Sequence, residues 1–176
     1  GLKGSSRWIE SHGTPFRKAN NEIVAQLAIT RDITDRKRME EELLLLYTLI
    51  RETSLSEDFR SAIEITLRRI CETTGWVMGE AWVPSSDRSH LECSPAWYGG
   101  FEGLKKFRNI SEGFKFLPGM GLPGRSWSSK KPTWDRDVTL DSNFPRAPYA
   151  REAGLKGAMA IPILAGDEVV AVMDFF

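Results

Sequence analysis

Two cysteines and two histidines are the side chains best suited to act as nucleophiles, metal ligands or phosphoacceptors. Cys71 and Cys93 fall on different predicted elements, with no CxxC motif and no Cys/His cluster. Zinc sites and disulfide frameworks need such clusters, so neither is predicted. His12 and His90 are too few and too far apart to suggest a phosphoacceptor. With no set of nucleophile, base and orienting group, the sequence predicts no catalytic residue and no metal ligand.

A glycine-rich stretch from Gly119 to Gly124 could in principle hold a phosphate. It lacks the spaced Lys-Ser/Thr of a P-loop, and it does not follow a strand in a βαβ unit. We therefore interpret it as a turn before a short helix.

Tryptophan is abundant, with six residues in 176. Aromatic side chains often line small-molecule pockets, where a few polar groups orient the ligand. Plain core packing is the alternative, and both interpretations stay open at this point. Five of the six rings fall in the second part of the chain: Trp76, Trp82, Trp97, Trp127 and Trp134.

Composition excludes several classes of protein. The chain is 41% hydrophobic and 27% charged, which is ordinary for a globular domain. Lys plus Arg equals Asp plus Glu at 24 each, so no basic field favours nucleic acid. The sequence contains no apolar run long enough to span a membrane and no signal peptide. We expect a cytoplasmic fragment that contacts neither nucleic acid nor membrane.

The elements that position these residues begin with a hairpin and a long helix. Residues 6–18 and 23–33 read as two strands joined by turn formers at 19–22. Residues 35–54 predict a helix, begun by Thr34 as N-cap and Asp35 in the first turn. Apolar side chains recur along this helix at alternating spacings of four and three residues, at Met39, Leu43, Leu46 and Ile50.

A mixed α/β region follows. Residues 57–74 carry an apolar helical stripe that stops at Gly75. Residues 99–113 are ambiguous. The remaining predictions are strands at 76–83, 91–98, 132–138, 157–164 and 169–176, a short helix ending near Ser129, and a helix at 146–153.

The first part of the chain, RWIESHGTPFRKANNEIVAQLAITRDITDRKRMEEEL, resembles the end of a PAS domain, including the triplet Asp32-Ile33-Thr34 that joins the last strand to an output helix. Only the final third of such a domain would be present, in residues 1–34. The ligand-holding part would lie upstream, so the resemblance implies no PAS ligand here. Residues 35–54 would be the signalling linker helix.

Residues 55–176, with GLPGRSWSSKKPTWDRDV and then REAGLKGAMAIPILAGDEVVAVMDFF, resemble a GAF domain. The resemblance implies an α+β fold, with an antiparallel sheet flanked by helices. A GAF domain normally closes with a further helix, which these residues lack. The order PAS end, helix and GAF domain is that of bacterial sensor proteins, commonly histidine kinases of two-component systems or cyclic-dinucleotide enzymes.

The resemblance also places a ligand pocket between the sheet and the segments 113–138 and 143–153. Covalent bilin is disfavoured because Cys93 is followed by Ser94, and cyclic nucleotide because its Asn-Lys-Phe-Asp-Glu set is missing. We expect a non-covalent aromatic or heterocyclic ligand, although its identity, and that of any cofactor, is unknown. The implied ligand-binding residues are Trp97, Phe116, Trp127, Trp134, Asp135, Asp137, Arg146 and Tyr149.

The sequence allows two functions for this chain. The first is a regulatory input module that signals through a parallel homodimer of the 35–54 helix, with Met39, Leu43, Leu46 and Ile50 at the seam. The second is a redox enzyme on the GAF fold, similar to methionine sulfoxide reductases, using Cys93. Such an enzyme needs a second reachable thiol and a lowered pKa. The connector helix and the missing catalytic set favour signalling.

Overall fold

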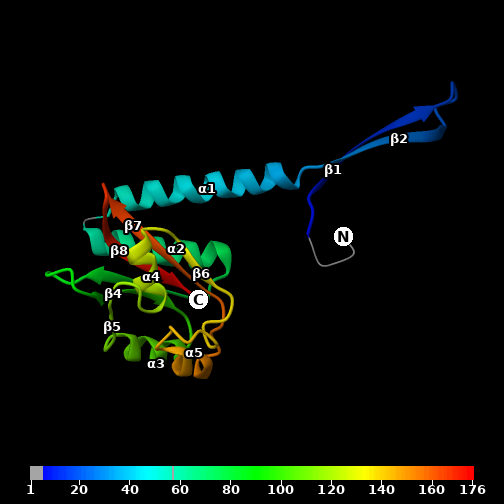
Figure 1. Cartoon of the computed structure of the whole chain (residues 1–176). Coiled ribbons are helices and arrows are strands. Elements are labelled where there is room, and N and C mark those ends of the chain that lie inside the picture. The colour runs from blue at the N-terminus through cyan, green and yellow to red at the C-terminus, as the bar shows by residue number, and fades with distance from the viewer. Residues whose placement is uncertain (1–5, 57) are drawn as a thin grey trace. The chain divides into compact units, whose positions relative to one another are not determined.

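The computed structural model describes residues 6–56 and 58–176. Clustering of contacts divides the chain into two compact units, Gly1–Thr48 and Leu49–Phe176 (Figure 1). Each unit is described by itself below. Among the described residues, no helix is both long and apolar enough to cross a membrane.

The first unit contains the predicted hairpin. Strands β1 (Ile9–Arg17) and β2 (Ile23–Asp32) pair antiparallel. The triplet at the end of β2 joins the hairpin to the helix, because Thr34 donates to Asp32 Oδ1 from its backbone N at 3.0 Å and from its Oγ1 at 2.6 Å. Thr34 Oγ1 also accepts from the backbone N of Trp8 at 3.0 Å. That these strands end a PAS domain stays a prediction.

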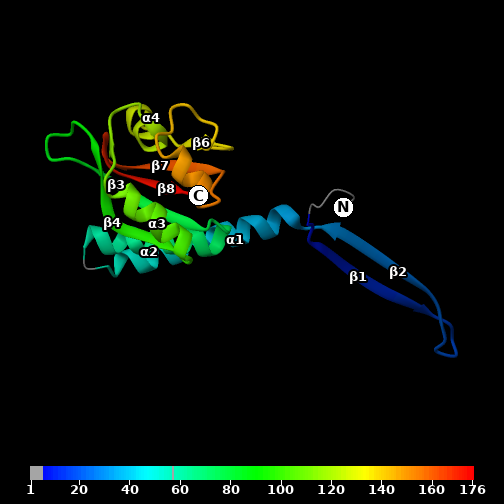
Figure 2. The ribbon, with the colours of Figure 1, turned by 90° about the horizontal axis from the view of Figure 1, so that it is seen from below.

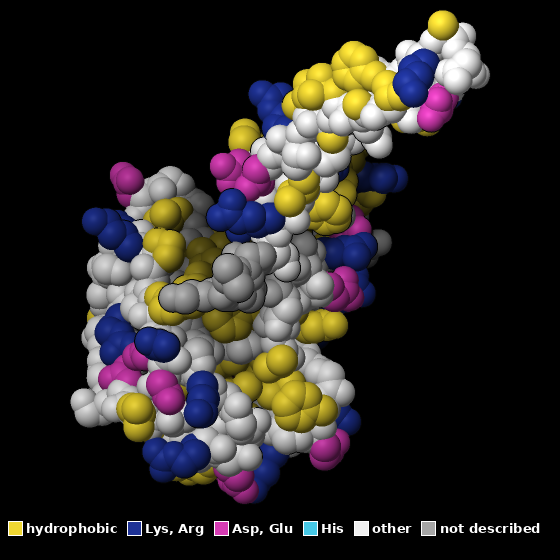
Figure 3. Space-filling model, turned by 90° about the vertical axis from the view of Figure 1, so that its right-hand side faces the viewer, with side chains coloured by type: hydrophobic (Ala, Val, Ile, Leu, Met, Phe, Trp, Pro, Cys, Tyr) yellow, Lys and Arg dark blue, Asp and Glu magenta, His cyan; other side chains and the backbone are white. Residues whose placement is uncertain are grey.

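Both strands of the hairpin carry exposed hydrophobic side chains. A lone two-stranded hairpin is marginally stable in water, so these side chains indicate a surface suited to packing. Figure 3 shows hydrophobic side chains on the surface of the hairpin. The large ones are Ile9, Phe16, Ile23, Val24, Leu27 and Ile29.

Helix α1 (Thr34–Ser54) confirms the predicted helix to within one residue at its start. None of its side chains is buried in the described chain. Near its end, Glu52 accepts from Arg69 Nε at 2.7 Å, an ion pair within the second unit.

The second unit is built on one antiparallel sheet of six strands in the order β5-β4-β3-β8-β7-β6. The α+β prediction is confirmed. The central strands β3 and β8 are the most buried, because they have neighbours on both sides and helices on both faces. The strands are β3 (Met78–Pro84), β4 (Leu91–Gly99), β5 (Lys115–Phe116), β6 (Thr133–Asp135), β7 (Ala158–Ala165) and β8 (Glu168–Phe175).

Helix α2 (Phe59–Thr74) covers one face of the sheet. It begins where Asp58 accepts from the backbone N of Ser61 at 2.8 Å, and it ends at Gly75, whose φ of 83° favours glycine. Its buried residues pack against side chains of β3, β4 and β8. They are Ile63, Leu67 and Cys71. We call this the outer face.

Three short helices lie on the opposite face, which we call the inner face (Figure 1). They are α3 (Glu102–Ser111), α4 (Gly121–Ser129) and α5 (Ala147–Glu152). The larger core cluster lies between them and the sheet, and it includes Trp82, Leu104, Phe107 and Leu122.

Two segments differ from the sequence predictions. The ambiguous stretch 99–113 contains α3, which begins after Phe101 without a side-chain cap and so lacks the usual start signal of a helix. The strand expected at 132–138 is only three residues long, because hydrogen bonds from Thr139 to the Asp137 side chain turn the chain there. The glycine-rich stretch is a turn that continues into α4 at Gly121, as predicted, and Gly119 N donates to Gly124 O at 2.8 Å.

Candidate functional site

Two acidic residues lie side by side on the inner face of the sheet. Glu80 of β3 and Asp174 of β8 are direct partners in the strand register, and neither is exposed. Cross-strand partners present their side chains on the same face, so the pairing of β3 with β8 brings the two carboxyl groups together. A buried carboxylate needs a counter-ion or hydrogen-bond donors.

Arg146, which comes just before α5, supplies the counter-ion. Its side chain is fully buried. Its Nη1 donates to Glu80 Oε1, and also to Ser111 Oγ at 2.6 Å. Its Nη2 donates to Asp174 Oδ2 at 3.2 Å. One guanidinium therefore connects both carboxyl groups to helix α3.

Aromatic rings enclose this guanidinium. Five ring centroids lie between 4.8 and 5.5 Å from Arg146 Cζ. All are within the range in which ring faces attract cations. We call Arg146 and these rings the Arg146 cage: Trp82, Phe107, Phe116, Phe144 and Phe176.

A second buried arginine lies at the edge of the cage. Arg108 of α3 is 2% exposed, and its Nη1 is 3.6 Å from Glu80 Oε2. The same guanidinium donates to the carbonyl of Ser94 and to Cys93 Sγ. Strand β4 bulges here, because Glu80 and Trp82, two positions apart in β3, pair with Trp97 and Cys93, four positions apart in β4. Glu80 is thus shared by two arginines.

Several buried polar atoms of this region make long or poorly aligned contacts in place of ordinary hydrogen bonds. Glu80 Oε2 lies 3.6 Å from Arg108 Nη1, and Arg108 Nε lies 3.6 Å from Glu112 Oε1. The Trp82 side chain interacts with the Asp174 carboxyl group and lowers its pKa. Arg146 Nε has no hydrogen-bond partner among the described residues. An aromatic enclosure with a few polar groups is a feature of sites for small molecules.

Burial raises the pKa of Asp174 well above its ordinary value. Arg146 lowers this pKa, whereas the neighbouring Glu80 raises it, and burial outweighs the arginine. The folded domain therefore favours a protonated Asp174.

Because of this shift, Asp174→Asn is expected to destabilise the domain less at about pH 8 than at about pH 5. The native state retains the Asp174 proton after the unfolded chain has lost it, so the stability contributed by the neutral acid is lost as pH rises through the folded pKa. Asparagine cannot titrate and does not lose this contribution. Urea unfolding of both proteins across this range provides the measurement. A difference in unfolding free energy that stays constant or grows with pH would contradict the assignment.

The two thiols lie on opposite faces of the sheet. Cys71 packs in the outer-face cluster under α2, whereas Cys93 packs against the inner-face cluster. Burial raises the pKa of each thiol to about 12. Both are therefore protonated thiols at neutral pH, and the sheet separates them.

The structure brings four of the predicted ligand-binding residues to the inner face. Phe116 and Arg146 belong to the cage. Trp97 and Trp127 are partly buried and pack against the same core cluster.

Tyr149 and Trp134 lie elsewhere. Tyr149, on α5, is 38% exposed, and its ring meets the edge of Phe114 at 6.5 Å. Trp134 is 64% exposed on the outer side, 5.5 Å from Trp76. The register explains this, because Trp134 pairs with Met159, whose side chain packs against the outer-face cluster.

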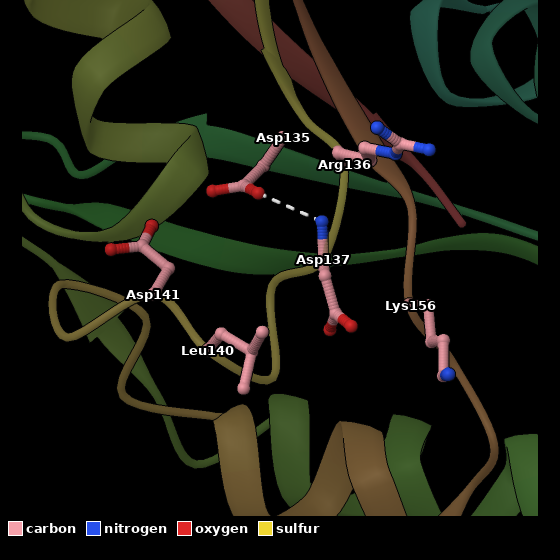
Figure 4. Close-up of a pocket in the computed structure, with 6 residues that line it drawn as sticks. All are labelled: Asp135, Arg136, Asp137, Leu140, Asp141 and Lys156. Atoms are coloured by element: carbon pink, nitrogen blue, oxygen red, sulfur yellow. Dashed lines mark hydrogen bonds between the residues drawn. The ribbon is translucent and has the colours of Figure 1, made fainter.

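Asp135 and Asp137 line an open pocket of about 680 Å³, which we call the acidic pocket. Figure 4 shows Asp135 at the end of β6, Asp137 on the segment that follows β6, and Lys156 on the segment that leads into β7. Hydrogen bonds from Thr139 lower the pKa of Asp137. Asp141 pairs with Arg125 at 2.7 Å, and Asp135 lies 3.8 Å from the same guanidinium. These carboxylates thus support local structure, and the described residues include no cluster of three that could hold a metal.

Sequence reasoning missed most of the charged residues at the centre of the site. A signal was available, since Glu80 and Asp174 each interrupt an apolar strand, in MGEAWV and VVAVMDFF. Charged residues in such strands are buried only when they are paired. The missed residues are Glu80, Trp82, Phe107, Arg108, Ser111 and Asp174.

The second unit is an α+β domain with one antiparallel sheet, helices on both faces and an enclosed polar centre. The chain belongs to the GAF domain family, whose model matches residues 56–176. A curated relative is Protein NLP3 of Arabidopsis thaliana, 29% identical over 115 residues, which cover 64% of this chain and 15% of that protein. The chain thus spans about a seventh of that relative.

Solved structures share the fold. The GAF domain of A. aeolicus nlh2, described in an inactive state, superposes with a TM-score of 0.62 at 18% identity, covering 78% of this chain and 80% of the other. Free methionine-R-sulfoxide reductase from Neisseria meningitidis, in complex with its substrate, superposes with a TM-score of 0.58 at 14% identity, covering 74% and 70%. At these identities the similarity shows the fold alone.

Proposed function

We propose that this chain is a sensory input fragment of a signal-transduction protein. In this proposal its GAF domain binds a small molecule, and helix α1 transmits the signal within a parallel homodimer. The observation that carries the proposal is the enclosed polar centre, in which an arginine and two carboxyl groups lie inside five aromatic rings.

The composition of this centre supports ligand binding over a purely structural role. A core needs no charges, and apolar residues of similar volume are often as stable as a buried ion pair or more so. Here Glu80, Arg108 and Arg146 are fully or almost fully buried beside Asp174, and Arg146 Nε has no hydrogen-bond partner among the described residues. Small-molecule sites combine an aromatic lining with a few polar groups in this way.

The properties of α1 support the signalling part. Its four seam residues, Met39, Leu43, Leu46 and Ile50, are 49–65% exposed within the described chain. Apolar side chains repeated at coiled-coil spacing are stabilised when a second helix covers them. A second copy of the same helix can cover these side chains, because in a symmetric dimer the same four positions of each copy face one another.

The neighbouring domain and the parent protein are also part of the proposal. The hairpin and the triplet at its end support a PAS domain before α1, and a sensor histidine kinase or cyclic-dinucleotide enzyme in the cytoplasm is the parent protein that we propose. The relative from Arabidopsis shows that similar segments also occur in a plant protein, so the effector domain is left open.

A redox enzyme that uses Cys93 is the alternative. Cys93 Sγ lies 2.8 Å from Arg108 Nη1, beside the cage, which is the observation in its favour. The raised pKa of the thiol and the position of Cys71 across the sheet both favour the sensor. A thiol enzyme needs a thiolate and a partner that resolves the oxidised intermediate.

Screening of the full chain for small-molecule ligands by thermal shift and calorimetry tests the proposal. A ligand at about 100 times its Kd is expected to stabilise the domain by about 2.7 kcal/mol, a rise in Tm of several degrees. Trp82→Phe should weaken its binding by about tenfold, because phenylalanine lacks the indole N–H and has a weaker cation-attracting face.

Two matched variants complete this experiment. Trp134→Phe makes the same change on the exposed outer side, and it should leave ligand affinity unchanged. Cys93→Ser should also retain binding, whereas it would abolish turnover of a methionine sulfoxide if the alternative were true. The proposal fails if no compound binds, or if binding is equally insensitive to both tryptophan substitutions.

A further inference from the structure

The last turn of α1 is attached to the GAF domain by a bidentate ion pair. Arg69 of α2 donates from Nε to Glu52 Oε2 at 2.7 Å and from Nη2 to Glu52 Oε1 at 2.5 Å. Paired bonds of this kind fix the relative orientation of the two groups, which a single contact does not. Hydrogen bonds from Arg69 lower the pKa of Glu52, so the carboxylate stays charged at neutral pH. We call Glu52 and Arg69 the α1–α2 clamp.

Apolar packing contributes little to the attachment of this turn. Among the described residues, neither hydrophobic cluster of the domain includes a side chain of α1. Only residues 55–58 separate α1, which ends at Ser54, from α2, which begins at Phe59. Such a short connection keeps the two helices close, but it does not set the angle between them. The α1–α2 clamp is therefore the described contact best able to set that angle.

The clamp and the proposed dimer seam use opposite sides of α1. Glu52 follows Ile50, a seam residue, by two positions, which is about 200° around an α-helix. A second copy that covers the seam therefore leaves Glu52 free to bind its own domain. The helix can be held by the GAF domain on one side and by a second copy on the other.

Helix α2 connects the clamp to the strand that carries Glu80. It lies along β3 and β4 (Figure 2). Leu67 and Cys71 of α2 pack against β3 at Gly79, where an added Cβ atom would lie 3.1 Å from Leu67 Cδ2 and 3.2 Å from Cys71 Sγ. Protein interiors packed this closely transmit strain, so α2 and β3 move together. A displacement of β3 near Glu80 therefore reaches Arg69.

We propose that the Glu52–Arg69 ion pair fixes the direction in which α1 leaves the GAF domain, so that α1 moves together with α2. The part of this ion pair in signalling rests on the proposed function, in which α1 is the output of the ligand site. The ion pair itself needs neither a ligand nor a dimer, so it can be tested on the full chain alone.

Hydrogen–deuterium exchange of the amides in residues 50–54 measures how firmly the last turn of α1 is held. Glu52→Gln should speed this exchange by about threefold to tenfold, because loss of a bidentate ion pair loosens the turn. Without a clamp the same substitution would slow exchange. It removes a negative charge from the negative end of the helix macrodipole and hardly changes helix propensity. The two explanations therefore predict opposite signs.

Further variants identify the two residues as one interaction. Arg69→Met should have the same effect as Glu52→Gln, and the double variant should exchange no faster than either single variant, because both substitutions break the same pair. NaCl at about 1 M should speed exchange in wild type by screening the pair, and it should not do so in Glu52→Gln. Glu64→Gln is the matched control, since it breaks an exposed ion pair with Arg60 within α2. It should leave residues 50–54 unchanged.

Exchange that slows or stays constant in Glu52→Gln would overturn the inference. Additive effects of the two substitutions, or a last turn that is unprotected in wild type, would overturn it equally. Light scattering separates these results from the proposed function. A monomeric wild type whose last turn responds to Glu52→Gln refutes the dimer and leaves the clamp standing. A dimer whose last turn does not respond refutes the clamp and leaves the dimer standing.

Discussion

Replacing Glu80 with alanine is expected to lower the free energy of unfolding of the GAF domain by about 3–5 kcal/mol. The substitution removes the carboxylate shared by Arg146 and Arg108, and it leaves two buried guanidinium groups with less compensation. Removing one partner from a buried ion pair is far more destabilising than the pair is stabilising, because the remaining charge stays out of water. Urea unfolding followed by tryptophan fluorescence measures the change.

Glu152→Ala is the matched control for this prediction. Glu152 also pairs with a basic residue, Lys106, but both side chains are mostly exposed. Its loss should change the unfolding free energy by less than about 1 kcal/mol. An effect of Glu80→Ala as small as that of the control would contradict the prediction, because it would show that the buried ion pairs of Glu80 do not contribute to stability.

Joint replacement of the network separates its two roles. A variant with Met at both Glu80 and Arg146 should recover part of the stability lost by Glu80→Ala, because Arg146 is removed together with its counter-ion, whereas Arg108 keeps Glu112 as its acidic partner. The same variant should no longer bind a ligand at the cage. Stability and function would then be seen to depend on different properties of the same residues.

The second large effect concerns α1. Joint substitution of Leu43 and Leu46 by glutamate is expected to convert a dimer into a monomer, because two charges at the seam would repel their copies across it. Light scattering should then find the single-chain mass of 19.9 kDa in place of twice that value. Neither leucine is buried within the described chain, so the folding of each unit should be retained.

Leu44→Glu provides the matched control for the seam. Leu44 is 65% exposed, comparable with Leu43, but the spacing of four and three residues leaves it outside the seam. The dimer should persist in this variant. A wild-type chain that is monomeric, or equal effects of Leu44→Glu and the double substitution, would contradict a parallel dimer with this seam.

The seam and the cage are parts of one proposal with different tests. Arg146 and Glu80 are expected to determine whether the GAF domain binds a ligand. Leu43 and Leu46 are expected to determine whether the chain forms the dimer that transmits the signal. A cage variant that dimerises normally but does not bind, and a seam variant that binds but stays monomeric, would show that the two parts are separable.

Much of the secondary structure could be predicted, because it depends on local signals. The helical stripe of Phe59, Ile63 and Leu67, ended by Gly75, appears as α2 with a glycine in the left-handed region. The last hairpin appears as β7 and β8. The helix of residues 102–111 was not predicted, since two glycines precede it and Phe101 at its start provides no side-chain cap.

By itself, the sequence determined the GAF fold class and the helix that precedes the domain, and its resemblance to GAF domains placed Phe116 and Arg146 on one face of the sheet. Only the tertiary structure decided what that site contains. Glu80, Arg146 and Asp174 are far apart in the chain, and they meet because β3 pairs with β8 and the segment before α5 lies across that pair. Trp134, close to its predicted partners in sequence, is turned to the other face by the two-residue period of its strand. Strand order and register are non-local properties, and they determine which charged groups share a buried site.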